Sequence, residues 1–244
     1  MDIEQLKRSI CEVIEMTDPG GSPTINFIRR AKKGIETEGQ KLGVFPGSFD
    51  PLTEAHIEVI AEARKYKLAE TLLVLDIKNV DKSAFGASLE ERLLMLLLFF
   101  EGDEEISIAL SSHGLFLDKV RALQGKYPPA TKIVYLVGYD TIVRILDKKY
   151  YQDREAALTE LFAESEFLVA GRSGEEEQAI ADLFEKEENR RFGHKIKTVK
   201  ITPFASTISA TEVRHKVKQG EPITGLVPEA IARLVEQLQL YKET

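Results

Sequence analysis

Short apolar runs alternate with amphipathic stretches along most of the chain, which favours a parallel sheet covered by helices. The apolar runs predict strands near residues 42–46, 71–77, 105–110, 132–138, 166–170 and 196–201. The amphipathic stretches predict helices near residues 54–67, 88–100, 114–125, 154–163, 175–189, 209–218 and 228–240. This order predicts an α/β fold with a Rossmann-like parallel sheet flanked by helices.

The first 40 residues have a different pattern. An amphipathic segment over Ile3–Ile14 is followed by a cluster of turn residues and then by a basic stretch, Asn26–Gly34, that we expect to be helical. Its basic side chains are expected to form a solvated helix face. We therefore divide the chain into a short N-terminal helical extension, residues 1–40, and a Rossmann-like domain, residues 41–244.

Composition limits the classes of protein and of site. The chain has 244 residues with 43% hydrophobic residues, and its one cysteine, Cys11, excludes a disulfide framework or a cysteine zinc site. The four histidines lack metal-site spacing, so we expect no metal site built from the protein. The longest apolar run, Leu93–Phe100, is too short for a membrane span, and a formal charge of -7 disfavours nucleic acid as a partner. We expect a cytoplasmic protein.

The stretch Gly43–His56 carries the strongest chemical signal. It reads as an apolar strand, a turn in which Gly47 allows close backbone approach, and a helix that begins near Thr53 after Pro51. His56 then stands on the first turn of that helix. Because the first N–H groups of a helix lack partners within the helix, this arrangement is suited to bind phosphate.

A second segment is expected to meet the first. In doubly wound sheets, ligands bind beyond the carboxyl ends of the strands. Gly47–His56 follows the first predicted strand of the domain, and Gly138–Asp140 follows the fourth. The two segments should therefore converge on one crevice.

A third segment lies far along the chain, at Ser206–Arg214. Ser209 suits a helix N-cap, and Glu212, three residues later, completes a capping box. Arg214 would then lie over the first turns of the helix, beside its unpaired N–H groups. A well-capped helix explains this pattern, and so does an anion site that could hold the β- and γ-phosphates of ATP.

Two of these segments resemble signatures of the nucleotidyltransferase superfamily with the His/Thr-x-Gly-His motif. Here the motif stands as Thr53-Glu54-Ala55-His56, with alanine in place of the usual glycine. Ser206–Arg214 resembles the second signature, Ile-Ser-Ser-Thr-x-x-Arg, and Gly138-Tyr139-Asp140 resembles the Gly-Ala-Asp strand end of mononucleotide adenylyltransferases. The resemblance spans roughly residues 41–241 and is closest to the nicotinamide and nicotinate mononucleotide adenylyltransferases.

The resemblance implies a role for each matching residue. Catalysis is assigned to His56, Thr53, Lys82 and Arg214. ATP binding is assigned to Gly47, Ser48, Phe49, His56, Ser209, Thr211 and Arg214. Acceptor binding is assigned to Ser48, Phe49, Lys82, Asp140, Tyr150 and Tyr151. Tyr150 and Tyr151 stand where the family has a tryptophan that stacks on the pyridine ring, and this chain has no tryptophan.

The resemblance implies adenylyl transfer from ATP, with Mg²⁺, to nicotinamide or nicotinate mononucleotide, in NAD biosynthesis or salvage. No general base is needed, because the attacking phosphate is already ionised at neutral pH. Ser111–Phe116 lacks the Ser-Tyr-Thr pattern common in bacterial nicotinate enzymes, which leans toward nicotinamide and leaves both acceptors open. Phosphopantetheine as acceptor is one alternative, suggested by Asn79-x-x-Lys82, and a non-catalytic nucleotide sensor is another, suggested by Ala55. A homo-oligomer also stays open.

Overall fold

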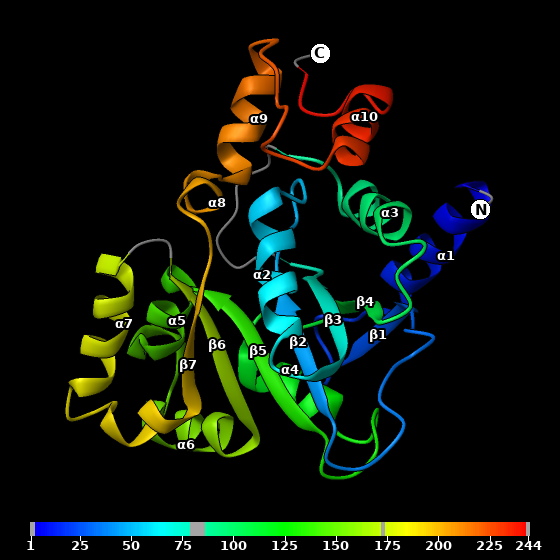
Figure 1. The fold of residues 1–244 in the computed structure, drawn as a ribbon. Helices are drawn as coiled ribbons and strands as arrows, with labels where there is room; N and C mark the ends of the chain where they lie inside the picture. The colour runs from blue at the N-terminus through cyan, green and yellow to red at the C-terminus, as the bar shows by residue number, and fades with distance from the viewer. Residues whose placement is uncertain (1–2, 79–85, 172–173, 243–244) are drawn as a thin grey trace.

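In the computed structural model, which describes residues 3–78, 86–171 and 174–242, strands and helices alternate along the chain (Figure 1). The strands are β1 (Ile25–Arg29), β2 (Lys41–Pro46), β3 (Leu68–Asp76), β4 (Ile106–Ser111), β5 (Lys132–Gly138), β6 (Ser165–Gly171) and β7 (Ile196–Lys200). The α-helices are α1 (Ile3–Met16), α2 (Glu54–Arg64), α3 (Leu89–Phe99), α4 (Phe116–Leu123), α5 (Tyr139–Leu146), α6 (Arg154–Glu164), α7 (Gly174–Glu185), α8 (Pro203–Thr207), α9 (Ala210–Lys218) and α10 (Glu229–Gln237). Two 3₁₀ turns, η1 (Lys148–Tyr150) and η2 (Arg190–Lys195), complete the set.

The strands form one seven-stranded sheet in the order β1-β4-β3-β2-β5-β6-β7. All neighbours are parallel except β1 and β4, which are antiparallel. The six parallel strands follow the doubly wound order, which reverses between β2 and β5. The predicted Rossmann-like α/β fold is confirmed.

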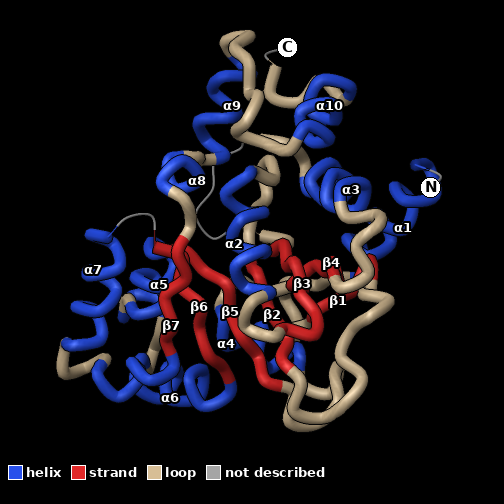
Figure 2. The backbone as a smooth tube through the Cα atoms, viewed as in Figure 1, coloured by secondary structure: helices blue, strands red, loops and turns tan. Residues whose placement is uncertain are grey.

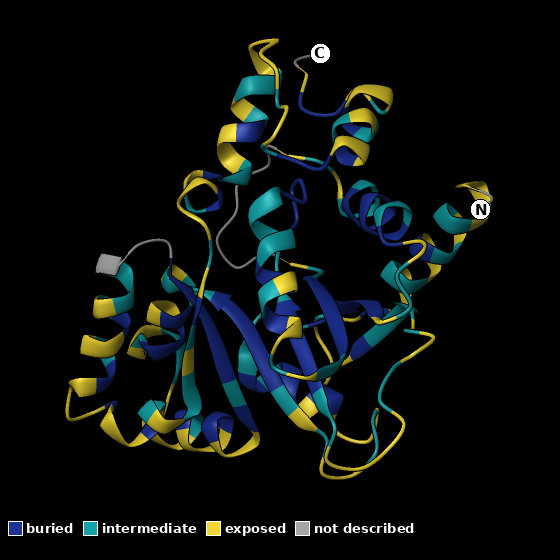
Figure 3. Ribbon diagram, in the orientation of Figure 1, coloured by how far each residue is buried: buried dark blue, intermediate teal, exposed yellow. Residues whose placement is uncertain are grey.

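Helices cover both faces of the sheet (Figure 2). Successive side chains of a strand point to opposite faces, so Leu72 and Val74 of β3 join one apolar cluster, while Leu73 and Leu75 join the other. The first cluster packs against α4–α7 and the second against α2, α3, α9 and α10. The inner strands β2–β6 are accordingly buried along most of their length, whereas the edge strands β1 and β7 and the outer faces of the helices are more exposed (Figure 3). Each fully buried leucine or valine contributes roughly 1.5–3 kcal/mol.

One prediction in the first 40 residues is wrong. The stretch expected to be a basic helix, residues 26–34, instead contains most of β1, which pairs with β4 at the edge of the sheet. Ile25 is buried there, and the Arg29 guanidinium donates to the main-chain oxygens of Phe100 and Ile106 at 2.6 and 3.1 Å. Main-chain pairing with a neighbouring strand and burial of one apolar face outweigh the local basic character, which is typical of how tertiary context overrides propensity.

The other N-terminal prediction is confirmed, because a helix does form over the first residues described and packs against α3. The division of the chain near residue 40 stays a prediction. The sequence pattern did not predict α5 or α8. Among the residues described, no helix is long and apolar enough to cross a membrane.

Candidate functional site

A cavity of about 580 Å³ lies beyond the carboxyl ends of β2 and β5, where the strand order reverses. This volume is within the range of small-molecule sites, roughly 300–1,000 Å³. Residues of both predicted segments, 47–56 and 138–140, line it. Their predicted convergence on one crevice is confirmed. α8 and the start of α9 contribute Ser209 and Thr211 to another part of the wall.

The turn after β2 is shaped by an aromatic side chain. Gly47 donates its N–H to the oxygen of Val74 at 3.0 Å, and a Cβ added at Gly47 would lie 2.9 Å from the Phe49 ring. Glycine is therefore required because Phe49 folds back against the turn. The structure places Phe49 in the core with 1% of its surface exposed, and its ring centroid lies 5.2 Å from that of His56. The buried Phe49 ring therefore packs against the ring of His56, the catalytic candidate.

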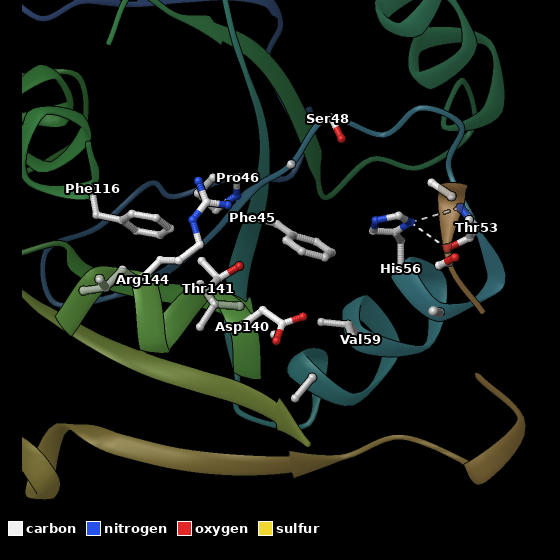
Figure 4. A pocket seen from close by; sticks show the side chains of 18 of the residues that line it. Phe45, Pro46, Ser48, Thr53, His56, Val59, Phe116, Asp140, Thr141 and Arg144 are labelled. Atoms are coloured by element: carbon white, nitrogen blue, oxygen red, sulfur yellow. Dashed lines mark hydrogen bonds between the residues drawn. The ribbon is translucent and has the colours of Figure 1, made fainter. Parts of the chain in front are cut away.

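His56 is fixed by the residue that starts its own helix. Its Nδ1 atom accepts the main-chain N–H of Thr53 at 3.0 Å and lies 2.7 Å from the Thr53 hydroxyl oxygen (Figure 4). The histidine thus takes the place that glutamate has in a common capping box. Because Nδ1 accepts, this network assigns the ring proton of the neutral imidazole to Nε2. Such a histidine can donate a hydrogen bond.

The second signature forms a capped helix start. The Ser209 hydroxyl accepts the main-chain N–H of Glu212 at 3.1 Å, which is the Ser209 half of the predicted capping box. Arg214 lies one turn into α9 and donates to the Thr211 hydroxyl at 3.2 Å and to the main-chain oxygen of Asp50 at 2.6 Å. Its side chain links the two signatures behind the cavity wall.

Asp50 is the centre of a buried polar cluster under the turn. Its Oδ1 accepts from the Tyr241 hydroxyl at 2.8 Å and from the main-chain N–H of Ala87 at 3.0 Å, while its Oδ2 lies 3.5 Å from Arg214. Burial, followed by the nearby Asp50 charge, raises the pKa of Tyr241. The cluster ties the C-terminal segment to both signatures. Sequence reasoning missed it because Tyr241 is distant along the chain and has no local pattern.

The two tyrosines predicted to stack on the acceptor differ in their surroundings. Both line the cavity. Tyr151 donates its hydroxyl to the oxygen of Ile145 at 2.8 Å and packs against an apolar cluster, and burial raises its pKa to about 12. Tyr150 lies on η1, with its ring 4.8 Å from the Lys149 ammonium. Tyr150 is therefore the better candidate for a stacking partner.

A buried ion pair that the sequence did not predict stands beside the cavity. Lys119 of α4 has a fully buried side chain, and its Nζ lies 2.7 Å from Oδ1 of Asp76, a residue that lines the cavity. The same Nζ donates to the main-chain oxygens of His113 and Gly114 at 2.9 and 3.0 Å. Asp76 is the last residue of the apolar strand β3. Side chains at the carboxyl end of a parallel strand reach such a crevice, and that signal could have found it.

Most predicted site residues come together. The cavity wall includes Gly47, Ser48, Thr53, His56, Asp140, Tyr150, Tyr151, Ser209 and Thr211. Phe49 and Arg214 lie behind this wall, and Lys82 lies outside the described residues. Arg144 and Phe116, which were not predicted, also line the cavity, on the side away from His56 (Figure 4). The part of the chain that the structure describes has no group of three metal-binding side chains.

The chain is similar to known sequences that are named as nicotinamide or nicotinate mononucleotide adenylyltransferases. The family profile described as cytidylyltransferase-like matches residues 44–216. A Schizosaccharomyces pombe protein named as a nicotinamide mononucleotide adenylyltransferase is 30% identical over 224 residues, which cover 85% of this chain and 89% of that protein. A Thermoanaerobacter protein named as a nicotinate-nucleotide adenylyltransferase is 28% identical, with 83% and 95% covered.

Solved structures show the same fold at lower sequence identity. The nicotinic acid mononucleotide adenylyltransferase of Plasmodium falciparum, solved as a complex with NaAD, superposes with a TM-score of 0.61 at 18% identity. The match covers 83% of this chain and 97% of that one. A likeness at this identity supports the fold alone.

Proposed function

Because the chain belongs to the cytidylyltransferase-like family, we propose that it transfers the adenylyl group of ATP to a pyridine mononucleotide, which gives the dinucleotide and pyrophosphate in NAD biosynthesis or salvage. The observation that carries the proposal is one cavity lined by both nucleotidyltransferase signatures, at the switch point of a doubly wound sheet. All residues that line the cavity lie beyond residue 40, in keeping with a catalytic unit over residues 41–244.

ATP occupies the side of the cavity that holds His56 and the start of α9. Two helix N-termini, those of α2 and α9, supply main-chain N–H groups and a positive dipole end for the phosphates. Arg214 adds a fixed positive charge behind them. Its Nε is buried without a hydrogen-bond partner among the described residues, so this donor could reach a phosphate oxygen after a small movement. Thr211 and Ser209 complete this side.

The chemistry rests on alignment and on charge. The phosphate of the acceptor attacks the α-phosphorus of ATP in line, one P–O bond forms as the bond to pyrophosphate breaks, and no proton needs to be removed. Negative charge grows on the α- and β-phosphate oxygens in the transition state. The Nε2–H of His56, held in place by Thr53, donates to an α-phosphate oxygen, and Lys82 is proposed to add a second positive charge.

Mg²⁺ is proposed to arrive with ATP, bound by phosphate oxygens and water, as is usual for this ion. When bound it neutralises phosphate charge. Asp140 is proposed to contact the acceptor ribose and Tyr150 to stack on its ring, since both line the cavity. From the charge and composition of the chain, we also propose that it acts in the cytoplasm and does not bind nucleic acid.

The test is a screen with purified protein and ATP labelled on the α-phosphate. The acceptors are the two pyridine mononucleotides, phosphopantetheine and no acceptor. We expect labelled dinucleotide and an equal amount of pyrophosphate with a pyridine mononucleotide. Preferred transfer to phosphopantetheine would replace the acceptor but keep the reaction, whereas ATP binding without product would identify a nucleotide sensor.

A further inference from the structure

Adenylyl transfer as described leaves one feature of the cavity without a purpose, the ion pair between Asp76 and Lys119. Burial raises the pKa of the Asp76 carboxyl and lowers the pKa of the Lys119 ammonium, so each charge alone is disfavoured there. A buried pair of this kind is seldom worth more to stability than apolar side chains of the same volume. Its place beside the cavity suggests a role in recognition.

The contacts of Lys119 define the charge state of the pair. Three oxygen atoms lie 2.7–3.0 Å from Nζ, from Asp76, His113 and Gly114. Nζ donates to the two main-chain oxygens and is in ion-pair contact with Oδ1 of Asp76. An ammonium group suits three oxygens at this distance, whereas a neutral amine would turn its lone pair toward one of them. These contacts favour the protonated form of Lys119, and its positive charge beside Asp76 favours the ionised carboxylate.

The position of the pair assigns it to the acceptor. His56 and the start of α9 take the triphosphate side, which leaves the side with Phe116 for the pyridine ring (Figure 4). Asp76 belongs to this side, because the lysine that contacts it also donates to the oxygens of His113 and Gly114, three and two residues before Phe116 in the chain. Its side chain retains 21% exposure, and the residue lines the cavity.

We propose that Asp76, held as a carboxylate by Lys119, selects an acceptor ring that carries a carboxamide over one that carries a carboxylate, so that the acceptor is nicotinamide mononucleotide. This inference rests on the proposed adenylyl transfer. A carboxylate oxygen accepts a hydrogen bond from the amide NH₂, and it repels a second carboxylate. Arg144, on the same side of the cavity, has the opposite effect and is the natural control.

The test measures kcat/KM for nicotinamide and nicotinate mononucleotides with the full-length protein. The wild type should prefer nicotinamide mononucleotide. Asp76→Asn should lower the ratio of kcat/KM for nicotinamide mononucleotide to kcat/KM for nicotinate mononucleotide by about tenfold or more, because a hydrogen bond to a charged group is lost and a repulsion is removed. Asp76→Glu, which keeps the charge, should keep the sign of the preference. KM for ATP should stay unchanged in both variants.

Arg144→Gln serves as the control for general electrostatics. This variant should raise the ratio of kcat/KM for nicotinamide to nicotinate mononucleotide or leave it unchanged. A wild type that prefers nicotinate overturns the proposal, even if the Asp76 variants fail to fold. An Asp76→Asn variant that folds, as judged by its Tm, and keeps the wild-type ratio also overturns it. A wild type that transfers to neither mononucleotide refutes the proposed function instead, so the two failures are distinguishable.

Discussion

The two sides of the cavity are built in different ways. The ATP side comes from two short stretches, in which Thr53 fixes His56 three residues away and Ser209 caps the helix that carries Arg214. The acceptor side is assembled from the end of β3, the turn before α4, α5 and η1, which are separate segments of the chain. Local hydrogen bonds position His56 and cap the start of α9 on the first side, although Arg214 also bonds to the distant Asp50. The second side depends on a contact between separate segments, that of Lys119 with Asp76.

This difference teaches where function can change. A local capping motif depends on residues within one helical turn, so it stays in place as long as the strand, the turn and the helix are kept. The acceptor side depends on contacts such as Lys119 with Asp76, which substitutions elsewhere in the fold can rearrange. We therefore expect changes on the ATP side to abolish turnover and changes on the acceptor side to alter selectivity.

The largest effect should follow His56→Ala. Loss of one preorganised donor to the transition state should lower kcat by about 10²-fold or more, with KM for either substrate changed much less. Steady-state kinetics and a thermal melt check this. His215→Ala, on the exposed face of α9, is the matched control and should keep wild-type kcat. An unchanged kcat in folded His56→Ala would make the histidine structural.

Arg214→Ala should weaken ATP binding by about 10- to 100-fold, because a charge-assisted contact to the phosphates is worth about 1.5–3 kcal/mol. Binding of the acceptor mononucleotide should change much less. Isothermal titration with each substrate measures both. Arg233→Ala on α10, an exposed arginine, should affect neither. Equal losses for both substrates would contradict the assignment of Arg214 to the triphosphate.

Tyr150→Ala should cost about 1–3 kcal/mol in acceptor binding, while Tyr150→Phe keeps the π face and should be nearly neutral. Tyr151→Ala is the contrasting variant. Because the Tyr151 hydroxyl and ring are tied into the core, this variant should lower Tm while the acceptor affinity of the folded fraction is kept. The reverse pattern, with Tyr151 alone affecting the acceptor, would exchange the two roles.

The smallest effect is expected for Tyr241→Phe. The ring stays buried and only the hydrogen bond to the Asp50 carboxylate is lost, which should lower the free energy of unfolding by about 1.5 kcal/mol. KM for ATP should rise a few-fold, because Asp50 positions Arg214, and KM for the acceptor should not change. Denaturant melts and kinetics measure these quantities. A rise in KM for the acceptor without a rise in KM for ATP would contradict the assignment of the C-terminal segment to the ATP side.

The sequence by itself determined most of the sheet and the reaction. Each of the six predicted strands overlaps an observed one. The reason is that short apolar runs bounded by turn residues are typical of strands buried in a parallel sheet. The two nucleotidyltransferase signatures could also be found from the sequence, because each N-cap residue and its hydrogen-bond partner lie within one helical turn. The rule that parallel strands end at one edge then predicted that segments 47–56 and 138–140 would meet.

Tertiary structure decided the features whose partners are far apart along the chain. The stretch at 26–34 looks helical by itself, and only the free edge of β4 makes part of it a strand. From the sequence, Phe49 is expected to contact the substrates, yet its ring is buried and packs against His56. Lys119 reads as a surface lysine, but the oxygens of His113, Gly114 and Asp76 stabilise it in the interior. Propensity acts between neighbours in sequence, whereas burial and charge pairing act between neighbours in space.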